Sequence, residues 1–288
     1  MSLNRRNFLK TLGGLGLTLA AGNVMGKEAS EERKEFKAVL VDSTLCIGCQ
    51  SCEMACAEAH GFEMPEDFPE VGVERKTGPD RRTVVNAFET EAGETYVKKQ
   101  CMHCNEPACA AACLTKAIVK TKEGPVIWRS DKCMGCRYCM VSCPFEVPKF
   151  EYNEWNPKIV KCDMCAEKTL EGGSPECASN CPTGALTFGT RRDMIAEAHK
   201  RIAENPDTYV NEIYGENHAG GTSFIYISSA PFDEIGFNTE IKREAYPKLT
   251  KGFLYSVPSV FLLLPPALLG IYEATKNNQN EEEETDNE

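Results

Sequence analysis

Sixteen cysteines in four groups of four constrain this chain of 288 residues more than any other feature. In the first and third groups, successive cysteines are separated by two, two and three residues. The second group has gaps of two, four and three residues, and the fourth has gaps of two, eleven and three. Tight and loose groups therefore alternate, as expected of a duplicated unit. The groups are Cys46, Cys49, Cys52 and Cys56; Cys101, Cys104, Cys109 and Cys113; Cys133, Cys136, Cys139 and Cys143; and Cys162, Cys165, Cys177 and Cys181.

This spacing predicts iron–sulfur ligation. Gaps of two residues make a short loop whose thiolates converge on one cluster, and its backbone N–H groups can bond to sulfur. A further gap of three residues carries the last cysteine about one helical turn onward, and in two-cluster ferredoxins that cysteine ligates the other cluster. Pro144 and Pro182 directly follow two of these last cysteines and redirect the chain. We therefore expect all sixteen cysteines to bind four 4Fe–4S clusters.

Other uses of cysteine fit the spacing less well. A disulfide scaffold suits an exported protein with an even number of cysteines, but adjacent Cys-x-x-Cys pairs are poor cross-links. Zinc ribbons use two separated pairs, and redox Cys-x-x-Cys chemistry explains a single pair. The net charge of −11 argues against a nucleic-acid partner. Because no nucleophile–base arrangement or open metal site is evident, we expect the chain not to be an enzyme by itself.

Both ends of the sequence suggest a relation to a membrane. Arg5 and Arg6 precede a mildly apolar stretch, so residues 1–26 are predicted to be a twin-arginine export signal; the alternative is a basic, frayed N-terminus. Residues 253–272 carry no charge and have the length of a transmembrane helix, although a buried or interfacial helix is the alternative. Residues 273–288 are acidic and are expected to form a disordered tail.

The intervening chain predicts an α+β fold, a duplicated bacterial (2×4Fe-4S) ferredoxin-like domain with loop insertions. We expect this four-cluster domain at residues 36–192 and a C-terminal extension at 193–250. The 44 residues between the first two groups are expected to form a loop-rich insertion. We expect an amphipathic helix at Arg191–Asn205. The expected strands are Ala117–Val119, Pro125–Trp128, Ala185–Phe188 and Ser223–Ile227.

The four histidines carry weaker predictions. His103 lies inside the second group of cysteines, where it can donate a hydrogen bond to a cluster or simply pack, and the two interpretations are equally supported. His60, His199 and His218 lie in polar or turn-like surroundings and are expected at the surface.

Several segments resemble the four-cluster ferredoxin-type electron-transfer subunits of membrane-bound respiratory oxidoreductases. The chain is most like the HybA-type subunit of periplasmic nickel–iron hydrogenase, and formate dehydrogenase β subunits are similar. The export signal, the C-terminal anchor and the segment of Tyr214 to Thr222 contribute to this resemblance. The matching cysteine-bearing and neighbouring segments are residues 42–50, 98–104, 133–144 and 188–191.

The resemblance also implies how the cysteines are shared. One departure is Leu114, which stands where the family usually has proline after the last cysteine of the second group, and it puts that turn in question. The implied ligand sets are Cys46, Cys49, Cys52 and Cys181; Cys162, Cys165, Cys177 and Cys56; Cys101, Cys104, Cys109 and Cys143; and Cys133, Cys136, Cys139 and Cys113.

The resemblance further implies a role in electron transfer. Electrons would pass between a catalytic subunit, either a hydrogenase or a molybdenum enzyme, and a quinone-reactive integral membrane subunit. The chain would lie at the cell inner membrane, with its cluster domain on the periplasmic side. The alternatives are the same role in a molybdenum or tungsten oxidoreductase, such as formate dehydrogenase or polysulfide or sulfoxide reductase, and a maturation ferredoxin.

Overall fold

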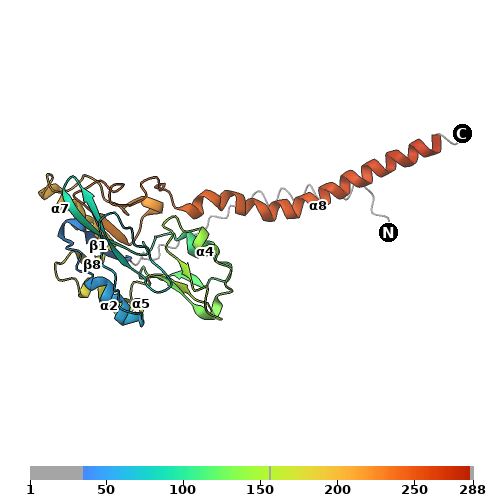
Figure 1. Ribbon diagram of the computed structural model, residues 1–288. Helices are drawn as coiled ribbons and strands as arrows, with labels where there is room; N and C mark the ends of the chain where they lie inside the picture. Colours follow the sequence, from blue (N-terminus) through green and yellow to red (C-terminus); the bar gives the residue numbers. More distant parts are fainter. Residues whose placement is uncertain (1–34, 156, 286–288) are drawn as a thin grey trace. The chain divides into compact units, whose positions relative to one another are not determined.

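The computed structural model describes residues 35–155 and 157–285, so the predicted export signal lies outside the described residues. The elements follow one another as short strands and short helices, ending in one long helix (Figure 1). Their order is β1 Lys37–Asp42, α2 Ser51–His60, β2 Val84–Thr90, β3 Gly93–Lys99, α3 Ala108–Ala111, β4 Ile118–Lys120, β5 Val126–Trp128, α4 Tyr138–Val141, β6 Lys149–Phe150, β7 Ile159–Val160, α5 Ala166–Leu170, α6 Glu176–Ser179, β8 Leu186–Thr190, α7 Arg191–Glu204, β9 Phe224–Ile227 and α8 Tyr246–Thr285, with single 3₁₀ turns at Ser43–Leu45, Ser130–Lys132 and His218–Gly220.

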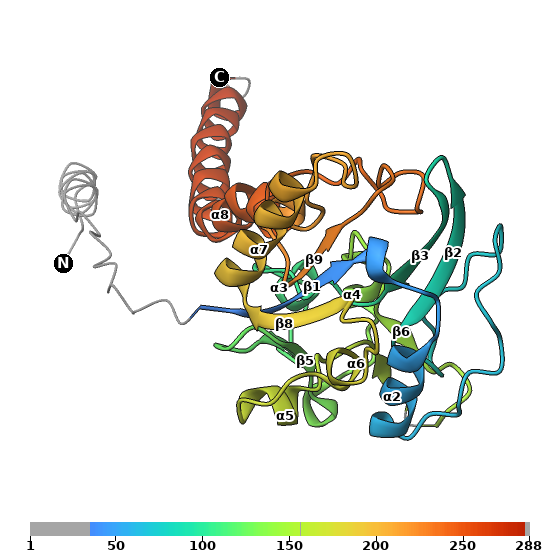
Figure 2. The same cartoon turned by 90° about the vertical axis from the view of Figure 1, so that its left-hand side faces the viewer.

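A three-stranded sheet in the order β8-β1-β9 forms the centre of the domain (Figure 2). The middle strand β1 pairs antiparallel with β8 and parallel with β9. Five of its six residues are buried, as expected of a strand covered on both faces. Strand β9, from the expected extension at 193–250, pairs with β1 of the expected ferredoxin domain at 36–192, so the two segments share one sheet.

Helix α7 covers one face of the sheet and confirms the predicted amphipathic helix. The side chain of Thr190 accepts a hydrogen bond from the N–H of Asp193 at 3.3 Å and so caps the helix. The buried residues of the helix are Met194, Ala198 and Ile202, which pack against Ala38, Leu40, Ile225 and Ile227 of the sheet. The opposite face packs against a larger cluster that includes Val39, Val41, Tyr214, Phe224, Tyr226, Phe232 and Ile235.

Three antiparallel pairs of strands complete the sheet structure. The pairs β4–β5 and β6–β7 are two or three residues long, and β8, β4, β5 and β9 confirm the four predicted strands. The segment expected to be a loop-rich insertion contains β2 and β3, which form a seven-residue hairpin. The correction has a simple physical reason: Val84 and Val97 are buried on one face of the hairpin and Val85 on the other, so both of its faces are covered by the rest of the domain.

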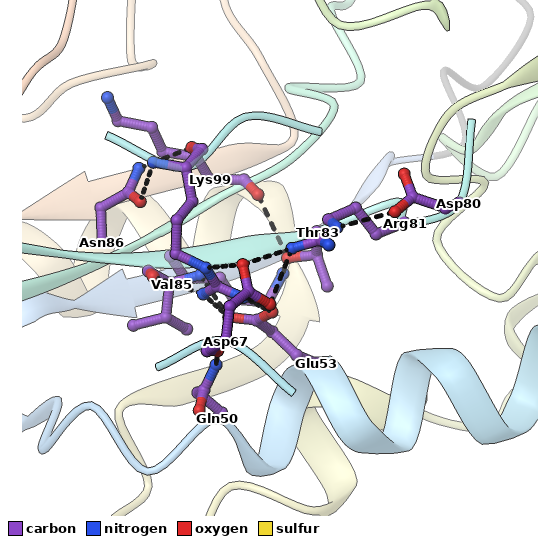
Figure 3. Close-up of polar contacts among 11 residues, drawn as sticks. Gln50, Glu53, Asp67, Asp80, Arg81, Thr83, Val85, Asn86 and Lys99 are labelled. Carbon is purple, nitrogen blue, oxygen red and sulfur yellow. Dashed lines mark hydrogen bonds and ion pairs between the residues drawn. The ribbon is translucent and has the colours of Figure 1, made fainter. Parts of the chain in front are cut away.

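The rest of that insertion, residues 61–83, forms an arm with little regular structure that is held by charged side chains (Figure 3). Arg75 binds both carboxylate oxygens of Glu53, at 2.7 and 2.9 Å, and the two side chains are 5% and 3% exposed. The same guanidinium bonds to Asp67 at 2.8 and 3.0 Å. Because Glu53 lies on α2 between two cysteines, this network attaches the arm to the first cysteine group.

Helix α8 runs from Tyr246 to Thr285 and contains Pro258, Pro265 and Pro266. Its portion from Tyr246 to Glu273 is long and apolar enough to cross a membrane, with a mean hydropathy of 1.8 and none of its apolar window buried. The helix begins before the expected span of 253–272 and continues past it. The backbone is helical as far as Thr285, which is beyond residue 273, where the expected disordered tail begins.

Candidate metal centres

The four Cys-x-x-Cys loops share one backbone feature. The residue directly before the second cysteine has a positive φ in every loop, a conformation that is costly for residues other than glycine. Two of these residues are glycines, and the other two are a histidine and a methionine held in the same conformation by the surrounding structure. The four residues are Gly48 at 70°, His103 at 48°, Gly135 at 72° and Met164 at 61°.

The turn after the last cysteine is also repeated in three of the groups. Its third residue has a positive φ and donates its N–H to the carbonyl oxygen of the cysteine. Leu114 is exposed and stands where the other two turns have proline, but its turn has the same geometry. The turn after Cys113 therefore keeps the geometry of the other two turns, although Leu114 replaces proline. The donors are Lys116, Glu146 and Gly184, bonded at 3.0, 3.2 and 3.4 Å to Cys113, Cys143 and Cys181.

Electrostatic interactions between thiols occur within each of the four ligand sets that the resemblance implies, here called sites A to D. They do not by themselves separate sites A and B, because Cys52 interacts more strongly with Cys177 than with Cys46. Site A consists of Cys46, Cys49, Cys52 and Cys181; site B of Cys56, Cys162, Cys165 and Cys177; site C of Cys101, Cys104, Cys109 and Cys143; and site D of Cys113, Cys133, Cys136 and Cys139.

The sites adjoin one another in a single order. Cys52 of site A interacts with Cys177 of site B. Cys162 of site B interacts with Cys101 of site C, and Cys109 of site C interacts with Cys139 of site D. The order A–B–C–D differs from the order of the cysteine groups along the chain, because each site takes its fourth cysteine from another group.

Burial raises the pKa values of several of these thiols. Burial raises the pKa of Cys56 and Cys109 to about 12, and it raises that of Cys139 and Cys143 to about 11. These thiols would keep their protons at neutral pH in the absence of a metal. A cluster binds thiolates, so iron has to displace the protons, and binding is thereby coupled to pH.

Backbone and side-chain donors around the sulfur atoms fit a 4Fe–4S cluster as well. The N–H of Ala117 donates to Cys113 Sγ at 3.1 Å, and the N–H of Met164 donates to Cys162 Sγ at 3.3 Å. Burial raises the pKa of the Cys113 thiol, but hydrogen bonds from Ile118, Thr115 and Ala117 outweigh it, and the pKa is lowered. Such hydrogen bonds stabilise the thiolate form that a cluster requires.

His103 is fully buried and neutral. Its Nδ1 accepts the N–H of Val126 at 2.8 Å, which places the ring proton on Nε2. Burial lowers the pKa of His103 well below its usual range, and the charges of Lys161, Lys120 and Lys98 lower it further. Its Nε2 has no hydrogen-bond partner within the described part of the chain. A buried N–H donor beside site C is the kind of group that a cluster sulfur would accept from.

Two of the other three histidines are not at the surface as predicted. His60 is half-buried, with Nε2 3.4 Å from Asp163 Oδ1 and 4.0 Å from Cys165 Sγ. His218 stacks on Tyr214 with ring centroids 4.2 Å apart. His199 is exposed as expected. The burial of His60 depends on Asp163 and Cys165, which are distant in sequence, whereas His218 packs on its near neighbour Tyr214.

The two ends of the series differ from its middle in exposure. Cys49 of site A and Cys136 of site D are exposed, whereas every cysteine of sites B and C is buried or half-buried. Large apolar side chains lie exposed beside both ends, among them Ile47 near site A and Met134 near site D. The middle sites are thus insulated from solvent, and the end sites are accessible to other molecules.

Comparison with known proteins agrees with this geometry. Residues 93–191 match the family described as 4Fe-4S dicluster domain. A protein of Nitratidesulfovibrio vulgaris (strain Hildenborough) is 41% identical, covering 96% of this chain and 78% of its own length. The hydrogenase-2 operon protein HybA of Escherichia coli O157:H7 is 36% identical over 81% of this chain and 83% of its own. A formate dehydrogenase iron-sulfur subunit of Haemophilus influenzae is 33% identical over 73% and 70%.

Proposed function

This chain belongs to the family of iron–sulfur electron-transfer subunits that includes HybA and the formate dehydrogenase iron-sulfur subunits, and we propose that it passes single electrons through four 4Fe–4S clusters. The observation that carries the proposal is the linear series of four four-thiol sites, A to D. All sixteen cysteines are then cluster ligands. A bound 4Fe–4S cluster supplies one-electron redox chemistry, and the protein supplies spacing, insulation and tuning of the potential.

Electrons enter and leave at the two accessible ends. Cys49 and Cys136 are the exposed thiols, and the apolar side chains of Ile47 and Met134 beside them would be covered by partner subunits. Burial of sites B and C keeps water and small oxidants away from the middle of the path. On this proposal one partner is the catalytic subunit, and the other is the quinone-reactive membrane subunit.

The start of α8 supports an assignment of the two ends. Lys248 Nζ lies 2.8 Å from Glu106 Oε1, and Glu106 is in the loop between Cys104 and Cys109 of site C. The apolar portion of α8 begins directly beyond this ion pair and is proposed to anchor the chain in the inner membrane. We therefore assign the C–D end to the membrane subunit and the A end to the catalytic subunit. The predicted export signal places the cluster domain on the periplasmic side.

Hydrogenase is the preferred catalytic partner because the HybA relative aligns with more of this chain than the formate dehydrogenase relative does, at higher identity. The second candidate is a molybdenum or tungsten oxidoreductase, supported by the formate dehydrogenase relatives. A maturation ferredoxin is less favoured. A series of sites anchored at the membrane suits continuous electron flow during respiration, whereas a maturation ferredoxin assists the assembly of another enzyme only temporarily.

Metal analysis of the native complex tests this assignment. The complex would be solubilised in detergent and captured through a tag at the C-terminus of this chain. Nickel together with abundant iron and labile sulfide supports the hydrogenase assignment, whereas molybdenum or tungsten without nickel moves the chain to the other branch. Absence of iron would contradict the proposal as a whole. Quinone reduction that survives a Cys104→Ser substitution would instead favour the maturation role.

A further inference from the structure

Three lysines have their ammonium groups inside the cluster-binding domain, surrounded by neutral oxygen atoms. Lys98, which is 2% exposed, donates to Thr83 Oγ1 and Gln100 Oε1, both at 2.7 Å. Lys120 donates to the carbonyl oxygen of His103 at 2.9 Å and to Ser223 Oγ at 3.3 Å. Lys161, which is 4% exposed, donates to the carbonyl oxygens of Val126 and Cys162.

None of the three has a carboxylate within ion-pair distance among the residues that the structure describes. The more exposed lysines of the same domain behave differently: Lys99 pairs with Glu74 at 2.8 Å, and Lys168 pairs with Glu176 at 2.7 Å. A buried ammonium group without a counter-charge is strongly unfavourable. The negative charge that balances these lysines must therefore come from a group that binds inside the domain.

Electrostatic interactions connect these lysines to the cysteines, which become negative when they bind a cluster as thiolates. Lys98 interacts most strongly with Cys177, then with Cys52 and Cys162. The ring of Phe224, whose centre is 5.5 Å from the ammonium group, belongs to the apolar cluster that contains Cys177 and against which Cys52 packs, so Lys98 lies near site A and site B together. Lys161 acts on Cys109 and Cys143 of site C, and Lys120 is attracted by Cys104 and Cys101 of the same site. Site D has no such lysine among the interactions of the described residues, and its Cys113 is stabilised by hydrogen bonds instead.

We propose that Lys98 is a permanent counter-ion shared by the clusters of sites A and B and that it raises their reduction potentials. This inference rests on the proposed function, since it requires clusters at both sites. Reduction adds an electron to a cluster, and a fixed positive charge in a medium of low dielectric constant favours the reduced form. Lys161 acts in the same way on site C, whereas burial lowers the pKa of Lys120 to about 7, so its charge is not permanent. Arg137 lines the surroundings of site D but is exposed, so its charge is screened by solvent and contributes less there.

Several contacts hold the Lys98 ammonium group in place. Lys98 lies on β3 opposite Val85, and its own carbonyl oxygen accepts a hydrogen bond from Tyr226 at 3.0 Å. Gln100, one of its two acceptors, donates to the same tyrosine hydroxyl at 2.6 Å. The ammonium group also lies 5.5 Å from the centre of the Phe224 ring. Backbone and side-chain contacts from β9 therefore fix the charge beside the thiols.

The test is a redox titration of the purified native complex, followed by electron paramagnetic resonance, with Lys98→Met compared with Lys99→Met. Lys99 is the neighbouring residue on the same strand and is paired with Glu74, so it controls for the loss of a positive charge from β3. We expect Lys98→Met to shift the midpoint potentials of two of the four clusters to more negative values. Lys99→Met should leave all four at their wild-type values.

A third variant separates charge from packing. Lys98→Arg keeps the charge and changes the shape, so it should keep the two potentials near their wild-type values even if iron content falls in Lys98→Met. Unchanged potentials in Lys98→Met with four clusters present, or equal shifts in Lys98→Arg and Lys98→Met, would overturn the inference. Absence of four clusters from the wild-type complex would instead contradict the proposed function, so the two failures are distinguishable.

Discussion

Sites A and B and sites C and D have the same loop geometry but very different surroundings. The first pair is attached to β1, β8 and α2. Strands β1 and β8 belong to the central sheet, which packs against two large apolar clusters, and α2 is ion-paired to the arm of residues 61–83. The second pair is held mostly by strands of two or three residues and by a small core of Cys109, Ile118, Val126, Cys139 and Ile159, although Met102 in the first loop of site C packs in the larger cluster. Two of these five core residues are themselves candidate ligands, so the C–D half depends more on its clusters. The conformation of the cysteine loops is thus determined by the local sequence, whereas the elements that pack around the loops depend on the rest of the fold.

Removal of iron should separate the two halves most clearly. We expect an iron chelator with a reductant to abolish protection of residues 108–150 from hydrogen exchange, because their small core loses its metal ligation. The sheet of β8, β1 and β9 should retain part of its protection, since its apolar clusters are mostly made of other side chains. Hydrogen exchange with mass spectrometry measures both regions in one sample. Equal loss in both halves would show that the comparison is wrong.

Breaking the buried ion pair should weaken only the A–B half. Arg75→Met leaves Glu53 buried without its partner, and loss of one member of a buried pair costs about 3–5 kcal/mol. We expect rapid hydrogen exchange of residues 61–83 and of α2, with no change in β4 and β5. Arg192→Met, which removes an exposed pair with Glu35, is the matched control and should cost about 0–1 kcal/mol. Unaltered protection of the arm in Arg75→Met would contradict the role given to this pair.

Mild acid should leave the arm attached. The hydrogen bonds from Arg75 hold the pKa of Asp67 well below its usual range, with smaller contributions from Arg81. Because the folded pKa is depressed, this contribution to stability is complete above the unfolded value of about 3.9 and is lost only as the pH falls below it. Exchange of residues 61–83, corrected for its intrinsic rate, should therefore be the same at pH 7 and pH 5. Asp67→Asn should raise exchange equally at both values, and a wild-type rise at pH 5 would refute the assignment.

The smallest effect is expected at Leu114. This side chain is 85% exposed, and its turn already has the geometry of the two turns that contain proline. Leu114→Pro should therefore change stability by about 0.5 kcal/mol or less. Thermal unfolding of the complex, followed by bleaching of cluster absorbance, gives the comparison with the wild type. A large shift in either direction would mean that the backbone of this turn is strained at Leu114.

Local elements were predictable where one pattern sufficed. The spacing of Met194, Ile195, Ala198 and Ile202 predicts a helix over Arg191–Asn205, and the structure has one at Arg191–Glu204; the short strands were predicted from β-prone runs between turns. The hairpin of β2 and β3 was missed although β-prone runs stand on both sides of Gly93, at Thr83 to Val85 and Thr95 to Val97. The burial of His60 was missed because Asp163 is distant in sequence, whereas that of His218 comes from the nearby Tyr214.

By itself the sequence determined the chemistry of this protein, because thiolate spacing limits what a short loop can bind, and that limit is local. It also determined the long apolar segment near the C-terminus, which needs only composition and length. Only the tertiary structure decided the order of the sites, the joining of β9 to β1 and the buried pair of Arg75 with Glu53. These depend on burial, which brings together residues far apart in the chain and makes charges costly unless they are paired. For the same reason, Lys98 and Lys99 are equivalent in sequence but not in the folded protein.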